Sequence, residues 1–227
     1  MHIPVSAIDI AVPSSANRIL DLGCGSGWLL ANARCRDTAI RVGVDVRQDA
    51  LRQGSLEFET LLLAASNGTS LCFGDSTFDV VIAHVSLPLM NTSLALKEVA
   101  RVLAPGGTAF LTLHTFRYLK RWAHTEITQR HWRGFPFLGY VLLNGLLLHF
   151  SLPQLTWTLN GRCFETVYSS HGIRKALVAA GFEDIQIESV DRRLWFACSA
   201  SKPPLVGSAA HRPVTWHVNE SRMTSGR

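Results

Sequence analysis

A glycine-rich segment that directly follows an apolar run constrains this chain most. Residues 21–27 read Asp-Leu-Gly-Cys-Gly-Ser-Gly, at the end of the apolar run Arg18–Leu22 and before a helical pattern from Trp28. A short apolar run that ends in a glycine turn is typical of a buried parallel strand. Because glycine has no Cβ, the backbone can turn sharply and approach a ligand closely. The segment predicts a strand, a binding loop and a helix in succession.

The first 115 residues alternate between strand-like and helix-like patterns. Such alternation forms βαβ units, and these build a parallel sheet. Strands are expected at 18–22, 40–46, 60–65, 78–83 and 108–114, with helices at 28–35, 48–56 and 94–103 between them. Asn91 or Thr92 can cap the third helix, and residues 104–107 should stop it. After an interruption, a helix is expected at 171–180 and strands at 182–190 and 194–199, with a turn at 191–193.

Asp45 ends the second predicted strand, 18 positions after Gly27. In a doubly wound sheet, neighbouring parallel strands present their carboxyl ends at one crevice, so we expect Asp45 beside the glycine-rich loop. A carboxylate there can accept hydrogen bonds from both hydroxyls of a ribose. The alternative is a solvated aspartate that caps the helix from Gln48, and the nearby loop favours the ribose role.

Several motifs occur in the order and spacing of one family. Ile19–Gly27 resembles the first motif of the class I S-adenosylmethionine-dependent methyltransferases, most closely the small-molecule group related to the ubiquinone and menaquinone methyltransferases. Val44-Asp45 fits the second motif, and residues 66–73, 78–81 and 98–107 lie where the later motifs are expected. The likeness covers about 18–116 and 170–199. It implies an α/β fold with a doubly wound, mostly parallel seven-stranded Rossmann-like sheet, helices on both faces and a helical insert after the fifth strand.

The resemblance also implies S-adenosyl-L-methionine as the cofactor and a set of residues around it. Asp21 would accept from the ammonium group of the cofactor. Asn67 replaces the acid that accepts from the adenine amino group in the family, although its side-chain carbonyl can still accept. The helix that often precedes the first strand is missing or very short, so the insert would cover the cofactor. The implied binding residues are Asp21, Gly23, Cys24, Gly25, Gly27, Asp45, Val46, Asn67, Gly68, Ala83 and His84, with no metal site.

His84 lies at the end of the fourth predicted strand, where the resemblance places the methyl acceptor. Histidine titrates near neutral pH, so His84 could act as a catalytic base toward a hydroxyl or an acidic carbon. The alternative is a histidine that only hydrogen-bonds near the methionine end of the cofactor, and the absence of a partner in the sequence favours it. His114 has the same two interpretations. Glu165 and Tyr168 could line the pocket, although a position on the solvated surface is favoured.

The insert, 116–160, is basic and aromatic in its first half and strongly apolar in its second. A bilayer span needs about 20 mostly apolar residues, and Phe135–Phe150 is shorter and interrupted, so we expect no transmembrane segment. Two alternatives remain open. The insert could be a lid whose apolar side packs on the sheet, or it could form an apolar substrate mouth or make a peripheral contact with a membrane surface.

Charge and composition limit the partners and the location. Residues 1–115 carry 8 basic and 10 acidic side chains, which argues against a core shaped for nucleic acid. We expect a methyltransferase domain over 1–200 and a disordered tail over 201–227, which is polar and basic. Met1–Val12 lacks a signal-peptide pattern, and five widely spaced cysteines are expected to be reduced, so a cytoplasmic protein is predicted. The oligomeric state is not indicated.

Three functions remain to be separated. The first is methyl transfer to a small, apolar and even lipid-like acceptor. The second is a catalytically silent module that binds S-adenosylmethionine. The third is a dinucleotide-dependent oxidoreductase, which the loop disfavours because its glycines stand at 23, 25 and 27, with Leu29 where a small residue is usual. No Pro-Pro-aromatic motif follows His84, so methylation of DNA or glutamine is not expected.

Overall fold

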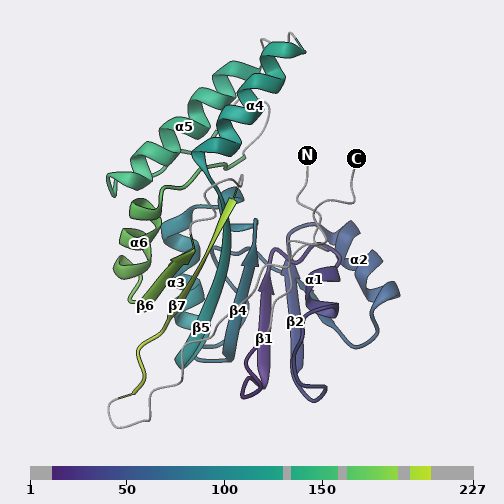
Figure 1. Ribbon diagram of the computed structural model, residues 1–227. Helices are drawn as coiled ribbons and strands as arrows, with labels where there is room; N and C mark the ends of the chain where they lie inside the picture. The colour runs from purple at the N-terminus through teal and green to yellow at the C-terminus, as the bar shows by residue number, and fades with distance from the viewer. Residues whose placement is uncertain (1–11, 130–133, 158–162, 189–194, 206–227) are drawn as a thin grey trace.

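The structure is a computed structural model that describes residues 12–129, 134–157, 163–188 and 195–205. Seven strands form one sheet in the order β3-β2-β1-β4-β5-β7-β6. This arrangement confirms the predicted doubly wound, mostly parallel sheet, which Figure 1 shows from one face. The strands are β1 (Arg18–Leu22), β2 (Ile40–Asp45), β3 (Leu62–Ala65), β4 (Phe78–His84), β5 (Leu103–His114), β6 (Glu183–Glu188) and β7 (Trp195–Ser201).

The strand register brings the ends of β1, β2 and β4 to one edge of the sheet. Leu22 lies beside Val44, and Asp21 lies beside Ile82, in parallel pairs on either side of β1. Only β7 departs from this direction, since it runs antiparallel to both β5 and β6. The change of strand order at β1 and β4 therefore opens a crevice at the carboxyl ends, the usual place for a ligand in such sheets.

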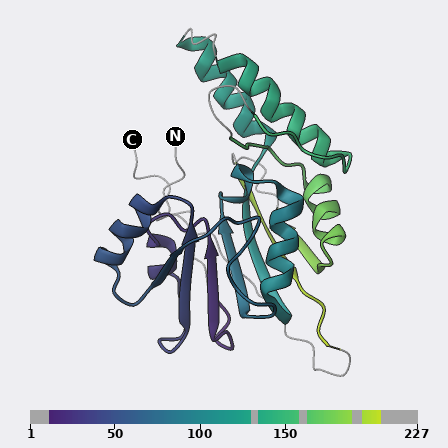
Figure 2. The ribbon, with the colours of Figure 1, turned by 180° about the vertical axis from the view of Figure 1, so that it is seen from behind.

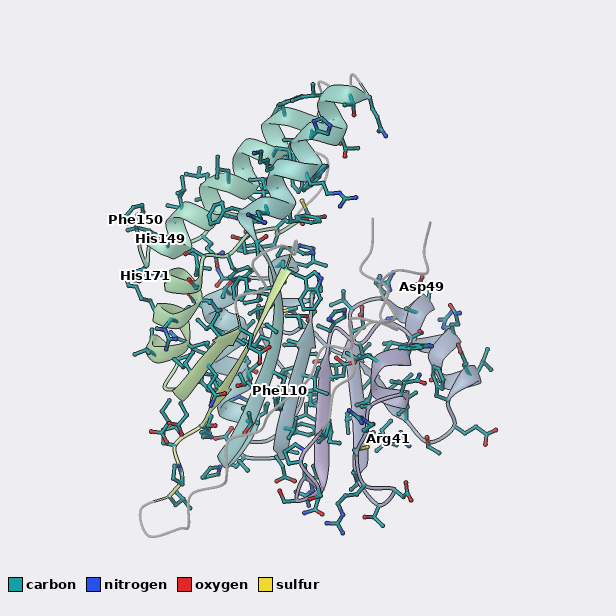
Figure 3. The ribbon with its side chains drawn as sticks, viewed as in Figure 1. Arg41, Asp49, Phe110, His149, Phe150 and His171 are labelled. Carbon is teal, nitrogen blue, oxygen red and sulfur yellow. The ribbon has the colours of Figure 1, made fainter. Side chains whose placement is uncertain are left out.

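Alternating side chains on the strands divide the apolar core between the two faces of the sheet. Leu20 and Val81 contribute to a core with α3 and α6, whereas Ile19 and Val80 contribute to one with α1. Figure 2 shows α3 and α6 on the near face, and Figure 3 shows Phe110 on the opposite face. The helices that flank the sheet are α1 (Trp28–Ala31), α2 (Gln48–Glu57), α3 (Thr92–Val102) and α6 (Ser170–Ala179), with a 3-10 helix η2 (Leu87–Leu89) after β4.

The insert is helical as predicted, and most of its described buried side chains pack within the insert rather than on the sheet, whereas Leu148 joins the core beside the sheet. α4 (Phe116–Thr128) and α5 (Phe135–His149) lie side by side beyond the carboxyl ends of the strands (Figure 1). The two helices form a cluster in which Leu119, Tyr140 and Val141 are buried with aromatic neighbours. α5 also packs against α6. None of the described helices combines the length and the apolar character that a bilayer crossing requires.

Several element boundaries differ from the predictions. α1 ends at Ala31 rather than near Cys35. β5 begins at Leu103, which pairs with Phe78 of β4, and the predicted turn is part of the strand because Gly106 N donates to Lys202 O and Gly107 O accepts from Lys202 N. The cap of α3 is confirmed, since Asn91 Oδ1 accepts from Leu94 N. The predicted turn at 191–193 and the tail from residue 206 lie outside the described residues.

Candidate functional site

The glycine-rich loop is fastened to the end of β2 through its backbone. Gly23 N and Cys24 N both donate to Val44 O, at 2.7 and 3.0 Å. Gly25 N donates to Asp45 Oδ2 at 2.8 Å, and the other carboxylate oxygen accepts from Arg47 N at 2.8 Å. The predicted neighbourhood of the loop and Asp45 is therefore present, and the carboxylate helps to fix the shape of the loop.

Glycine is required in the loop by both its backbone conformation and its close contacts. Gly23, Gly25 and Gly27 have φ angles of 75°, 57° and 82°, the left-handed region that other residues rarely adopt. A Cβ at Gly23 would overlap Ser86 Cβ, because Ser86 Oγ donates to Leu22 O and draws the end of β4 against the loop. The loop after β1 therefore packs directly against the segment that follows β4.

A pocket of about 590 Å³ opens beside this loop at the carboxyl edge of the sheet. Five of the predicted residues line it, namely Asp21, Gly23, Cys24, Gly25 and His84. Its other walls come from the start of α1, from the segment after β4 and from the insert. These additional lining residues are Ser26, Trp28, Leu29, Arg47, Val85, Leu89, His114, Tyr118 and Glu165.

Six predicted residues lie outside the lining of this pocket. Ala83 is fully buried in the core of the sheet, and Gly68 packs against Met90. Asn67 Oδ1 accepts from Thr69 N and from Thr69 Oγ1, at 3.0 and 2.9 Å. The structure therefore gathers Asp21 and most of the glycine-rich loop in the pocket, whereas Asp45, predicted for the ribose, and Asn67, predicted for the adenine, do not line it. The six are Gly27, Asp45, Val46, Asn67, Gly68 and Ala83.

Asp21 is a buried carboxyl group whose pKa is strongly raised. Its side chain is 1% exposed, and its Oδ1 atom has no hydrogen-bond partner among the described residues. Burial, and then repulsion from Asp45, raise the pKa of Asp21 from 3.8 to about 7. A buried carboxylate without a donor is costly, so this atom favours a ligand that brings a cation or an N–H group.

His84 is held in a neutral form. Its Nδ1 atom lies 2.6 Å from Thr112 Oγ1, and burial lowers the pKa of His84 to about 4. A catalytic base works best when its pKa lies near the working pH, so His84 is a weak base here. The next residue, Val85, has φ 52°, a strained conformation for a β-branched side chain, and it forms part of the pocket wall.

Two expectations about the segment before α6 were wrong. Tyr168 lies in the core at 1% exposure, and its hydroxyl forms a 2.8 Å hydrogen bond with Thr92 Oγ1. Glu165 is partly buried and lines the pocket, and burial raises its pKa to about 7. No local pattern in the sequence marks either position, because both depend on how the segment crosses the end of β5.

The insert supplies a residue that sequence reasoning missed. Tyr118 of α4 stacks on His114, with ring centroids 3.9 Å apart and an interplanar angle of 8°. Both rings line the pocket opposite the glycine-rich loop elements. The closeness of Tyr118 to the end of β5 was the only hint in the sequence. Arg47 was also missed, and its Nε atom lies 3.9 Å from Asp45 Oδ1.

The residues present fit the amino-acid end of S-adenosylmethionine. The orphaned carboxylate oxygen of Asp21 suits an ammonium group. At Gly25, an added Cβ would meet only the Arg47 guanidinium, so the backbone there faces open space. The pocket volume also lies within the range of about 300–1,000 Å³ that is usual for ligand sites. The cysteine in the loop, Cys24, stays a neutral thiol because burial and then Asp21 raise its pKa.

Known proteins are similar to this chain in sequence and in fold. Residues 20–111 match the family model described as a methyltransferase domain. A demethylmenaquinone methyltransferase of Corynebacterium kroppenstedtii is 35% identical over 98 residues, which are 42% of this chain and 41% of that protein. An uncharacterized methyltransferase of Mycobacterium bovis is 32% identical over 159 residues, 68% of this chain and 63% of that protein. The chain thus covers less than two thirds of either relative.

The fold comparison extends over more of the chain. A crystal structure of an S-adenosylmethionine-dependent methyltransferase from Methanosarcina mazei superposes with a TM-score of 0.57 at 19% identity, covering 85% of this chain and 95% of that one. At this identity the likeness concerns the fold alone, whereas the matched domain and the relatives concern the sequence. Together they show that the chain is similar, in sequence over part of its length and in fold over most of it, to S-adenosylmethionine-dependent methyltransferases, and that a demethylmenaquinone methyltransferase is among its relatives.

Proposed function

We propose that the chain transfers a methyl group from S-adenosylmethionine to a small, apolar acceptor. The observation that carries the proposal is the pocket itself, which combines the orphaned Asp21 carboxylate with apolar side chains such as Trp28 and Leu89 and with further polar groups. When bound, the cofactor supplies an activated methyl group on a positively charged sulfur. The protein then contributes orientation and exclusion of water, which are its main tasks in such a displacement.

In this proposal Asp21 binds the amino-acid portion of the cofactor, and Asp45 binds its ribose. Asp21 accepts from the ammonium group, which also relieves the cost of its burial. Each oxygen of Asp45 already accepts one backbone hydrogen bond and keeps a lone pair for a ribose hydroxyl. The Arg47 side chain, which is 63% exposed, has room to move aside as the ribose enters.

The insert, 116–160, acts as the lid over the acceptor. It contributes Tyr118 to the pocket, and its own aromatic cluster gives the helical pair a rigid shape independent of the sheet. Leu89 and Val85 provide the apolar wall on the facing side. The demethylmenaquinone methyltransferase among the relatives supports a ring-bearing acceptor, and lipid-like acceptors belong to the same class. His84, the base candidate predicted from the sequence, contributes a neutral imidazole to the pocket lining in this proposal.

Calorimetric titration of the full chain with S-adenosylhomocysteine and, in parallel, with NADH tests the cofactor assignment. We expect binding of the first and none of the second, and the reverse would establish the oxidoreductase alternative. Transfer of a labelled methyl group to a panel of apolar phenols, quinols, thiols and amines then tests catalysis. Binding without transfer to any extract or panel member would favour the silent binding module. Cell fractionation tests the predicted cytoplasmic location.

A further inference from the structure

Glu165 is carried to the pocket by a segment that crosses the ends of the sheet. Thr166 N donates to Pro88 O at 3.1 Å, and Tyr168 N donates to His114 O at 2.9 Å. These bonds tie the segment to the 3-10 helix after β4 and to the end of β5. The backbone of Glu165 is thereby fixed next to both walls of the acceptor space.

The insert fixes the same residue from the other side. Asn144 of α5 is fully buried, and its Nδ2 atom donates to Glu165 O at 3.1 Å and to Leu155 O at 2.9 Å. Its Oδ1 atom accepts from Leu155 N at 2.8 Å, so the buried amide is satisfied. Tyr140 Oη lies 3.4 Å from Glu165 N, which donates to it. A polar network of this kind, in the middle of an apolar helix, positions the Glu165 backbone at one place.

The Glu165 carboxylate lacks a charge partner among the described residues. Tyr118 from α4 and Cys163 from its own segment face it, and both stay neutral because burial raises their pKa, with a further increase from Glu165 itself. Among the described residues that line the pocket, Arg47 is the only lysine or arginine, and its Nε atom lies 3.9 Å from Asp45 Oδ1. Burial without a compensating donor leaves the carboxylate ready to accept a proton or an O–H hydrogen bond. The other titratable groups among the described residues of the pocket and its border are Asp21, Cys24, His84, His114, Tyr140 and Tyr168.

We propose that Glu165 binds the hydroxyl group of the acceptor and takes its proton, and that the acceptor is therefore a hydroxylated apolar ring. The inference rests on the proposed function, since it assigns a role within the same pocket. The hydroxyl proton passes to the carboxylate, and the oxygen forms a bond to the methyl carbon. The carbon–sulfur bond breaks, and its electron pair stays on sulfur. Glu165 then releases the proton to water.

Two other carboxyl or imidazole groups in the pocket suit this role less well. Asp21 lies on the loop beside Asp45 and is the partner for the cofactor's ammonium group. His84 holds its proton too weakly near neutral pH, because burial lowers its pKa to about 4. Glu165 has the matching proton affinity, since its pKa is raised to about 7 by burial alone.

Binding of ring probes tests the inference without any need for turnover. The full chain is saturated with S-adenosylhomocysteine and titrated with 2-naphthol, naphthalene and 2-(aminomethyl)naphthalene at about pH 8. We expect the wild type to prefer 2-naphthol over naphthalene by at least roughly tenfold, because a hydrogen bond to a carboxylate is stronger than one to a neutral group. Glu165→Gln should lose most of that preference, whereas Glu59→Gln, which changes an exposed glutamate, should keep it.

The pH dependence of the same titration isolates the carboxyl group. In the wild type, affinity for 2-naphthol should rise as pH passes through about 7 and Glu165 becomes ionised. Glu165→Gln removes only this carboxyl group. The ammonium group of the saturating S-adenosylhomocysteine keeps Asp21, the other group with a pKa of about 7, ionised throughout, so the affinity of the variant should stay flat over that range. An unchanged preference or an unchanged pH profile in a Glu165→Gln protein that melts normally would overturn the inference. So would a preference for the amine that Glu165→Gln abolishes, because Glu165 would then be a counter-ion for ammonium acceptors.

Titration with S-adenosylhomocysteine distinguishes failure of the proposed function from failure of the role of Glu165. A wild-type protein that fails to bind S-adenosylhomocysteine contradicts the proposed function and, with it, the role of Glu165. A protein that binds S-adenosylhomocysteine equally in the wild type and in Glu165→Gln, but shows no dependence of naphthol binding on Glu165, contradicts the further inference alone.

Discussion

Replacing Asp21 by asparagine should stabilise the ligand-free protein at alkaline pH and weaken its binding of the cofactor. The carboxyl group is almost fully buried, one of its oxygens is without a partner among the described residues, and its pKa is raised from 3.8 to about 7. Asparagine has the same shape and no charge. The two effects have opposite signs because the same burial that destabilises the free carboxylate prepares it for an ammonium group.

The magnitude follows from the shift in pKa. About three units correspond to about 4 kcal/mol, at about 1.36 kcal/mol per unit. The folded-state pKa lies above the unfolded value, so the folded protein binds this proton more tightly. The contribution of the group to stability is complete below about pH 4 and is lost as pH rises from about 4 to about 7. Asparagine has no such loss, and relaxation of the protein reduces the expected gain at about pH 8 to about 2–4 kcal/mol.

Urea denaturation and calorimetry measure the two effects separately. The difference in unfolding free energy between Asp21→Asn and wild type should widen by about 2 kcal/mol between about pH 5.5 and pH 8. Affinity for S-adenosylhomocysteine should fall by about 1.5–3 kcal/mol, the scale of a hydrogen bond that involves a charge. Asp49→Asn is the control, since Asp49 is exposed in the first turn of α2 (Figure 3). The reasoning is refuted if Asp21→Asn destabilises the protein equally at both pH values or binds the ligand with unchanged affinity.

Asp45→Ala should weaken S-adenosylhomocysteine binding by about 1.5–3 kcal/mol in calorimetry, and unchanged affinity in a folded variant would exclude the ribose role. Gly23→Ala should lower the unfolding free energy by about 2–5 kcal/mol in urea, from backbone strain and overlap with Ser86. Gly181→Ala, where φ is positive but no atom lies near the added Cβ, should cost only the strain of about 1–2 kcal/mol, and equal losses would contradict this account. Arg101→Met should cost about 2 kcal/mol in urea, because Arg101 binds Glu98, Asp75 and the carbonyls of Leu71 and Phe73; a neutral effect would show that water replaces these bonds.

Much of the sheet could be predicted because its signals are local. The apolar pair Ile19 and Leu20 is buried on both faces, as expected of a central parallel strand, and the same holds for Val80 and Val81. Boundaries were less predictable where the pairing is distant in sequence. Gly106 was read as part of a turn, yet its N–H group donates to Lys202 O, nearly a hundred residues later. No local pattern carries that information.

The glycine-rich loop and Asp21 were predictable for a different reason. Positive φ angles at three positions of the loop favour glycine, so the glycines in residues 21–27 indicate the backbone conformation directly. The six predicted residues outside the pocket lining show the limit of this inference. Their positions at strand ends were correct in outline, but whether a side chain such as that of Asn67 faces a ligand depends on neighbours such as Thr69.

The sequence by itself determined the order of most elements, the glycine-rich loop and the resemblance to methyltransferases, because periodicity, glycine positions and motif spacing act over short stretches of chain. Only the tertiary structure decided the acceptor side of the pocket. It placed Tyr118 and Glu165, which stand 47 positions apart, in one cavity with the loop. It also set the proton affinities of Asp21, His84 and Glu165, because desolvation arises only when the whole chain packs around a group.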